Sequence, residues 1–179
     1  MKILKSFFLA SLVLATLSLQ AQDDIFEDEQ PQPSQPAKWL TMSSAGLTMG
    51  FAEGWDTDGD DKNIVGVSPD GKVRITVFVS QFKTIEETVA NIQHEFSSWC
   101  DGLELQVPTY TMEVNGLKLL TIGGPANMEG AKVMVSVKIL ETPLEGDDGI
   151  IIIATYGFNE SMDQNMMGIL VANNSFKRA

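Results

Sequence analysis

The densest group of side chains that could do chemistry is a short acidic run at Asp56, Asp58, Asp60 and Asp61. Calcium takes several hard oxygen ligands on a tight loop, and alternating aspartates supply them. The helix–loop–helix calcium motif, however, needs Gly where Asp61 stands and a bidentate Glu where Val67 stands. The run therefore predicts either a calcium site or a solvated hairpin loop, and these two departures favour the loop.

Catalysis by an imidazole or a thiol has one candidate of each kind, because the chain holds one histidine, His94, and one cysteine, Cys100. Six residues of helix turn through about 600°, which puts the two side chains on separate faces. A Cys–His nucleophile pair within this helix is therefore excluded, and the sequence has no G-x-S-x-G motif for a serine hydrolase. We expect His94 to be exposed and Cys100 to act as a small buried hydrophobe. An exposed Cys100 would instead be able to link two chains.

Other motifs have a structural explanation. Residues 123–132 resemble a phosphate loop, but the glycine spacing is one residue too long and Lys132 does not directly follow the last glycine. Met162 and Met166 suit a soft metal, yet they lie on the apolar stripe of a predicted helix and are expected to fill the core. Carboxylates are plentiful, including a second acidic loop at residues 145–148, so a hydrolase with a dispersed carboxylate site stays an alternative.

The N-terminus predicts export. Lys2 and Lys5 precede an apolar run at residues 7–19 that is too short for an ordinary membrane span, and Ala21 provides the small residue of a cleavage site. We expect residues 1–21 to be a cleaved signal peptide, which leaves no membrane span. Without a cysteine at the cut, a lipid anchor is not expected. Residues 22–37 are acidic and then rich in Pro and Gln, so they predict a disordered linker.

The charge of the chain limits its partners. The 12 basic and 24 acidic residues give a net charge of −12, and removal of Lys2 and Lys5 with the signal peptide makes it −14. Such a domain repels phosphate backbones, so nucleic acid is not expected as a partner. Residues 38–179 are long enough for one domain with its own core, which a single cysteine cannot stabilise by an internal disulfide.

Strand and helix patterns alternate through this domain. Strands are predicted at residues 47–51, 64–67 and 72–80, with a polar loop at 56–63 and a turn at 68–71. A capping box at Thr84 opens one helix, whose apolar stripe continues to Trp99 and which ends at Asp101 and Gly102. A second capping box at Ser161 opens the closing helix. Its predicted stripe is Met162, Met166, Ile169 and Leu170, and it is expected to end in a left-handed turn at Asn173 and Asn174.

Between the helices lie two predicted hairpins. Strands at 109–114 and 117–122 flank Asn115-Gly116, a strong hairpin signal, and a wider loop follows at 123–130. Strands at 131–140 and 150–156 form the second hairpin. Residues 150–153 are all isoleucine, which is typical of a strand that is covered on both faces. The pattern predicts an α+β fold, a three-layer α/β/α sandwich with a central, mainly antiparallel twisted sheet.

The order of these elements resembles the Mog1/PsbP-like α/β/α sandwich family, including small bacterial secreted members of the DcrB type. The resemblance covers residues 39–177. It lies in the Gly-Trp turn that ends at Trp55, the helix at Thr84, the Asn115-Gly116 hairpin, and the closing helix that runs into Lys177. It implies a twisted antiparallel sheet between helices and a non-enzymatic role.

The sequence and this resemblance together predict an exported, non-enzymatic accessory or interaction domain with a protein partner and no cofactor. The first alternative is a calcium- or small-ligand-binding module that uses the run from Asp56 to Asp61. The second alternative is the hydrolase.

Overall fold

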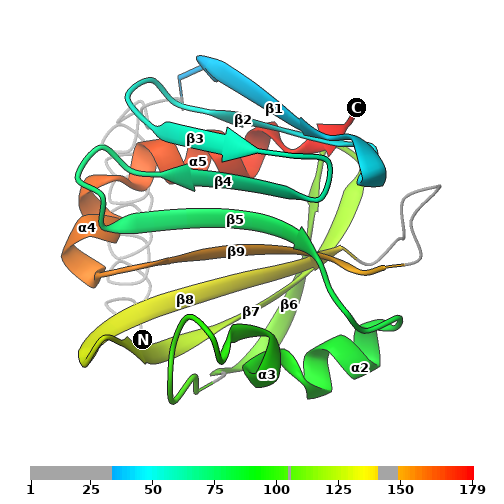
Figure 1. Ribbon diagram of the computed structural model, residues 1–179, viewed down its shortest axis with the longest axis vertical. Helices are drawn as coiled ribbons and strands as arrows, with labels where there is room; N and C mark the ends of the chain where they lie inside the picture. The colour runs from blue at the N-terminus through cyan, green and yellow to red at the C-terminus, as the bar shows by residue number, and fades with distance from the viewer. Residues whose placement is uncertain (1–33, 105, 141–148) are drawn as a thin grey trace, which may run out of the picture. The chain divides into compact units, whose positions relative to one another are not determined.

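The computed structural model describes residues 34–104, 106–140 and 149–179 (Figure 1). Within these residues, strands of a seven-stranded antiparallel sheet follow the order β3 (Asp56–Gly59), β4 (Asn63–Val67), β5 (Val73–Val79), β9 (Ile151–Gly157), β8 (Ala131–Leu140), β7 (Leu117–Met128) and β6 (Gln106–Val114). A second, three-stranded sheet has the order β1 (Lys38–Met42), β2 (Leu47–Phe51) and β10 (Lys177–Arg178). The helices are η1 (Ser43–Ala45), α2 (Ile85–Ala90), α3 (Ile92–Phe96), α4 (Asn159–Gln164) and α5 (Met166–Ser175). The chain thus has the predicted α+β fold.

The isoleucine-rich strand β9 lies in the middle of the seven-stranded sheet, as predicted. Ile151 and Ile153 belong to a core cluster that includes residues of α5, whereas Ile152 and Ala154 belong to a second cluster that includes residues of α3. Successive residues of a strand point to opposite faces, so β9 contributes to both cores at once. Full burial of each isoleucine contributes about 1.5–3 kcal/mol.

The layer on the α5 side of the sheet contains strands as well as helices. The three-stranded sheet lies beside α5 (Figure 1), and its strand β2 contributes Phe51 to the same core as α5. A Cβ atom added to Gly66 of β4 would lie 2.1 Å from Phe51. Only a helix was expected in this layer, because strand pairing between residues as distant as those of β2 and β10 leaves no local pattern in the sequence.

The first helical segment is interrupted, although its cap and its stripe are confirmed. Thr84 Oγ1 accepts a hydrogen bond from the backbone N–H of Glu87, and Ile92 and Phe96 are buried. The break between α2 and α3 falls at Asn91, with φ −114° and ψ 13°. The Asn91 side chain donates to the Glu87 carbonyl oxygen at 2.8 Å. Such side-chain bonds to the backbone compete with regular helix, which explains the break.

The predicted wide loop at residues 123–130 is wrong. Strand β7 continues to Met128 and pairs with β8 up to a tight turn at Glu129 and Gly130, which have φ values of 52° and 80°. Pro125 lies within this strand, where it cannot donate to the ladder. It is tolerated because regular pairing with β6 ends at Gly123, beyond which the outer neighbour is an irregular segment.

The details of the closing helix were also predicted wrongly. It begins at Asn159, two residues before Ser161, and no side chain caps it. Of the predicted stripe, Met162 and Ile169 do pack in the core, whereas Met166 and Leu170 are exposed. The helix ends without a left-handed residue, because the side chain of Asn115 donates to the carbonyl oxygens of Asn174 and Phe176. These hydrogen bonds supply donors to carbonyl oxygens at the end of the helix, which a left-handed turn would otherwise pair with its own backbone N–H groups.

Several predictions fall on parts of the chain outside the described residues. They are the signal peptide at residues 1–21, most of the linker at 22–37, and the second acidic loop at 145–148. At the start of the described range, the backbone N–H of Ala37 donates to the carbonyl oxygen of Phe51 on β2. No helix in the described part of the chain is long and apolar enough to cross a membrane.

Candidate binding site

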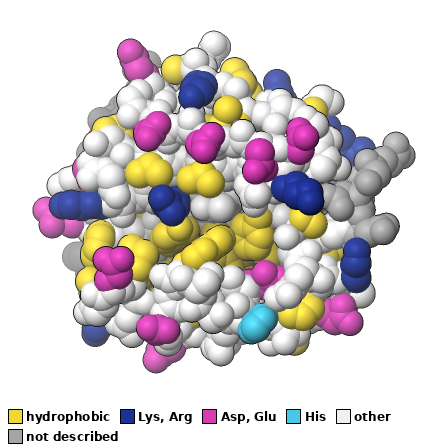
Figure 2. Space-filling model, viewed as in Figure 1, with side chains coloured by type: hydrophobic (Ala, Val, Ile, Leu, Met, Phe, Trp, Pro, Cys, Tyr) yellow, Lys and Arg dark blue, Asp and Glu magenta, His cyan; other side chains and the backbone are white. Residues whose placement is uncertain are grey.

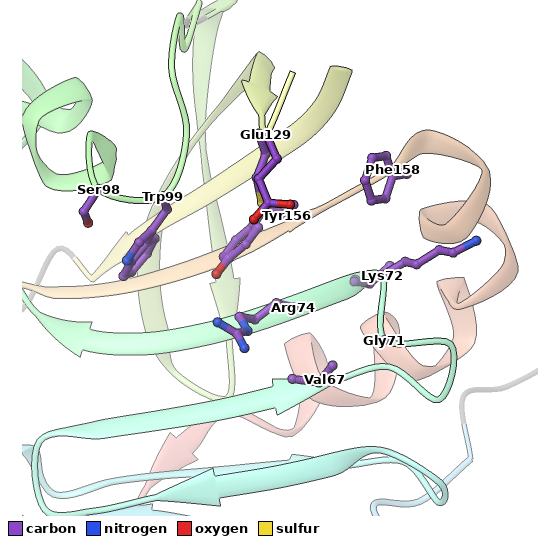
Figure 3. A pocket seen from close by; sticks show the side chains of 11 residues that line it. Val67, Gly71, Lys72, Arg74, Ser98, Trp99, Glu129, Tyr156 and Phe158 are labelled. Atoms are coloured by element: carbon purple, nitrogen blue, oxygen red, sulfur yellow. The ribbon is translucent and has the colours of Figure 1, made fainter. Parts of the chain in front are cut away.

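An open pocket of about 390 Å³ lies on the α3 side of the seven-stranded sheet. We call it the aromatic pocket. Its lining comes from β4, the start of β5, the segment after α3, the β7–β8 turn and the end of β9 (Figure 3). The lining residues are Val67, Gly71, Lys72, Val73, Arg74, Ser98, Trp99, Met128, Glu129, Tyr156 and Phe158. Figure 2 shows apolar side chains in a hollow on this side of the molecule, with charged side chains around it.

The register of the sheet builds the floor of the pocket. Val67 pairs with Arg74, and Arg74 pairs with Tyr156, so these three side chains form one row across three strands. Trp99 comes from the segment after α3 and stacks on Tyr156, with ring centroids 5.8 Å apart and planes 22° apart. Edge-to-face contacts with Phe78 and Phe96 fix the indole from its other sides. The floor is therefore a rigid aromatic surface.

Opposite charges stand on the two sides of this floor. Arg74 and Lys72 belong to the β5 side, and Glu129 belongs to the β7–β8 turn across β9 (Figure 3). All three side chains are exposed. Two neighbouring cations are a local exception in a chain with a net charge of −12. The pocket can therefore hold an apolar group that carries a negative charge toward β5.

Glu129 has an unusual backbone for its residue type. Its φ of 52° lies in the left-handed region, where a side chain with a Cβ atom costs about 1–2 kcal/mol. A second two-residue turn with positive φ values among the described residues has Asn115 and Gly116, which tolerate that region. Because strained backbone positions cluster at functional sites, a glutamate at such a position on the rim of a pocket indicates a role for its carboxylate.

The acidic run predicted to bind calcium is divided between a strand and a turn. Asp56 and Asp58 lie in β3, which replaces the predicted polar loop, whereas Asp60 and Asp61 lie in the turn to β4. Asp60 Oδ1 accepts hydrogen bonds from the backbone N–H groups of Lys62 and Asn63, and these bonds lower the pKa of Asp60. Asp60 thus has a structural role in the turn of this hairpin. Among the described residues, no group of three or more His, Cys, Asp or Glu side chains could hold a metal ion.

Calcium binding by this run stays a prediction, and a thermal melt tests it. A rise in Tm in millimolar calcium would support the site, because a ligand that binds only the folded state stabilises it. An unchanged Tm would remove the basis for it.

Neither of the two predicted reactive residues, His94 and Cys100, is among the lining residues of the aromatic pocket. His94 is exposed, as predicted, and its carbonyl accepts from the hydroxyl of Ser97. Cys100 is half-buried, and burial raises the pKa of its thiol, which keeps it protonated and weakly nucleophilic at neutral pH. In the aromatic pocket, Glu129 is the single carboxylate among the lining residues, whereas a glycoside hydrolase needs two.

One buried charge was missed by the sequence analysis. Lys138 of β8 is only 6% exposed, and its Nζ donates to Asn173 Oδ1 at 2.9 Å. Burial lowers its pKa to about 8. The sequence of β8 gives only a weak indication that Lys138 is buried. Its odd-numbered residues are all aliphatic, whereas its even-numbered residues include Ser136 and Lys138, which is the pattern of a strand with one polar face. The burial itself depends on the covering layer and cannot be inferred from β8 alone.

Neither the models of known protein families nor the sequences of curated proteins match this chain. Solved structures match in fold. Cyanobacterial PsbP (CyanoP) from Synechocystis has a TM-score of 0.55 at 10% identity, over 83% of this chain and 96% of that one. The Ran-binding protein Mog1p of Saccharomyces cerevisiae has a TM-score of 0.50 at 12% identity, over 81% and 96%.

A structure from Bacteroides thetaiotaomicron has a TM-score of 0.53 at 9% identity, over 81% of this chain and 49% of that one. This chain therefore matches about half the length of that protein. Together, these similarities confirm the Mog1/PsbP-like fold. They do not test the narrower resemblance to secreted DcrB-type proteins.

Proposed function

We propose that this chain is an exported, non-enzymatic interaction domain that binds a protein partner at the aromatic pocket. The observation that carries the proposal is the stacked pair of Trp99 and Tyr156 beside the exposed Arg74. Trp, Tyr and Arg are the residue types that dominate the energetics of protein interfaces. Because the stack is fixed by neighbouring aromatic rings, little side-chain entropy is lost when a partner binds.

The charges around the pocket define the partner further. An aromatic or aliphatic side chain would lie on the stack, and an acidic residue next to it would face Arg74, which lies beside Tyr156 (Figure 3). A basic residue on the other side would face Glu129. Mog1p, which shares the fold, is a Ran-binding protein. That similarity supports protein binding as a use of the fold and leaves the partner of this chain open.

Affinity capture from the cell envelope tests the proposal with a charge reversal. Arg74→Glu changes an exposed residue in the pocket, so the variant is expected to keep the fold and lose the partner. Lys62→Glu is the matched control. Lys62 directly precedes β4 and does not line the pocket, which β4 reaches only at its other end, at Val67. A protein recovered by the wild type and by Lys62→Glu but not by Arg74→Glu supports the proposal. Equal recovery by all three proteins, or none by the wild type, contradicts it.

A further inference from the structure

The small three-stranded sheet is basic, although the chain as a whole is acidic. Its strands β1, β2 and β10 hold Lys38, Lys177 and Arg178 and no acidic residue. The neighbouring helix α5 has no charged residue. All three basic side chains are exposed, in a chain with a net charge of −12. This sheet therefore forms a local basic surface, which attracts acidic partners and repels basic ones.

A groove of about 340 Å³ lies on this surface. We call it the terminal groove. Its lining comes from residues 34–36, β1, the β6–β7 turn, the last turns of α5 and β10. None of these described lining residues carries a carboxylate. The groove shares no lining residue with the aromatic pocket, so the two sites are separate.

Contacts with β2 and α5 fix the walls of the groove. A Cβ atom added to Gly50 of β2 would lie 2.5 Å from Pro36 and 3.2 Å from Trp39, so both side chains pack against this glycine. The hydroxyl of Ser175 accepts a hydrogen bond from the backbone N–H of Gly50 at 2.8 Å. On the other side, Asn115 donates two hydrogen bonds to carbonyl oxygens at the end of α5. Because these walls are already ordered, little conformational entropy is lost there when a ligand binds.

The groove offers an apolar surface and a cation side by side. Trp39 is 43% exposed, and Lys177 Nζ lies 4.3 Å from the centroid of its ring. This cation–π contact holds the ammonium group in place, and its donor hydrogens can still bind a carboxylate. Because the ammonium lies over the ring, the site suits a carboxylate better than a sugar, which stacks on an open aromatic face. The exposed amides of Gln35 and Asn174 can pair with the peptide groups of the same ligand.

We propose that the terminal groove binds an acidic peptide segment of a second protein partner. An apolar side chain of the segment contacts Trp39, and a neighbouring carboxylate accepts a hydrogen bond from Lys177 Nζ. Lys38 and Arg178 add a longer-range attraction, which salt screens. With a different partner at the aromatic pocket, the domain is an adaptor that holds two proteins at once. The adaptor role rests on the proposed function, whereas binding at the groove does not.

Titration of the full chain with three synthetic peptides tests the groove. The first peptide is Glu-Glu-Leu-Glu-Glu, the second has Gln in place of every Glu, and the third has Ser in place of Leu. The readout is the NMR signal of the Trp39 indole N–H, which a Trp39→Phe variant assigns. The first peptide is expected to shift this signal along a saturable curve. Each of the other two is expected to bind about tenfold more weakly, because one of the two contacts is lost.

Three results would overturn the proposal. They are no saturable shift with the first peptide, equal affinities of the first and second peptides, and glucuronate binding as tightly as the first peptide. The last result would assign the groove to an acidic sugar instead.

Charge variants locate the site. Lys177→Gln is expected to weaken binding of the first peptide about tenfold, because a charge-assisted hydrogen bond is lost, and to reduce the salt dependence of binding. Lys132→Gln is the matched control, since Lys132 is an exposed lysine of β8 that does not line the groove. Equal affinities of these two variants would show a general charge effect and contradict the groove. Arg74→Glu, which tests the aromatic pocket, is expected to leave the peptide affinity unchanged, so the two proposals can fail separately.

Discussion

Replacement of Lys138 by methionine is expected to stabilise the protein at neutral pH. Burial lowers the pKa of Lys138 from 10.5 to about 8, so the charged form is less favourable in the folded state than in the unfolded state. A difference of this size corresponds to about 3 kcal/mol at pH 7. The lost hydrogen bond to Asn173 offsets about 1 kcal/mol of the gain. The expected net change is therefore about 2 kcal/mol, or about 4–8 °C in Tm.

The pH dependence distinguishes this explanation from a general packing effect. Because the folded-state pKa of Lys138 is depressed, the unfolded state binds more protons between pH 8 and 10.5. The wild type therefore gains stability as the pH rises through this window, and the destabilising contribution is fully present below pH 8. Lys138→Met has no such gain. The difference in stability between the two proteins is expected to fall by about 2–3 kcal/mol between pH 7 and pH 10, so that the advantage of the variant is lost at pH 10.

Urea unfolding of both proteins at a series of pH values measures this difference, since the titrations of all other groups cancel. Lys132→Met is the control, because Lys132 is exposed on the same strand. It is expected to change stability by no more than about 0.5 kcal/mol. A variant at position 138 that is less stable than the wild type at pH 7, or a difference that does not vary with pH, would refute the reasoning.

Three further substitutions test the packing and the turns. Gly168→Ala is expected to destabilise the fold by about 1–3 kcal/mol in urea unfolding, because the added Cβ atom would lie 2.3 Å from Trp55 Nε1. An unchanged free energy of unfolding would show that α5 can shift to make room. Asn115→Asp removes the donor to two carbonyls at the end of α5 and adds a negative charge there, so Tm is expected to fall by the equivalent of about 1–2 kcal/mol. Glu129→Asn is expected to raise stability by about 1 kcal/mol, because Asn tolerates a positive φ, and to weaken partner capture. Unchanged capture would limit Glu129 to a role in the turn.

The sequence predicted correctly those elements whose formation depends on residues that are neighbours in the chain. The Asn115-Gly116 turn, the cap at Thr84 and the doubly buried strand β9 are all confirmed. Each depends on residues that are neighbours in the chain or on the apolar character of one strand. The continuation of β7 past Gly123 could not be predicted, because a glycine and proline segment is stabilised there by its partner β8.

The candidate sites depend on contacts between distant parts of the chain. Trp99 was predicted on an apolar stripe and Tyr156 in a strand, but their stacking requires the α3 segment to lie over the end of β9. The burial of Lys138 likewise requires the layer that contains α5. In both cases the residue types were visible in the sequence, whereas the contacts that these residues make depend on the tertiary fold.

The most direct test of the proposed function is site-specific photo-cross-linking in the native cell envelope. A benzophenone amino acid replaces Phe158 on the pocket rim in one protein and Lys62 at the far end of β4 in another. A protein that binds at the aromatic pocket is expected to form one discrete adduct from position 158 and none from position 62. The same adducts from both positions, or no adduct from position 158, would contradict binding at this pocket.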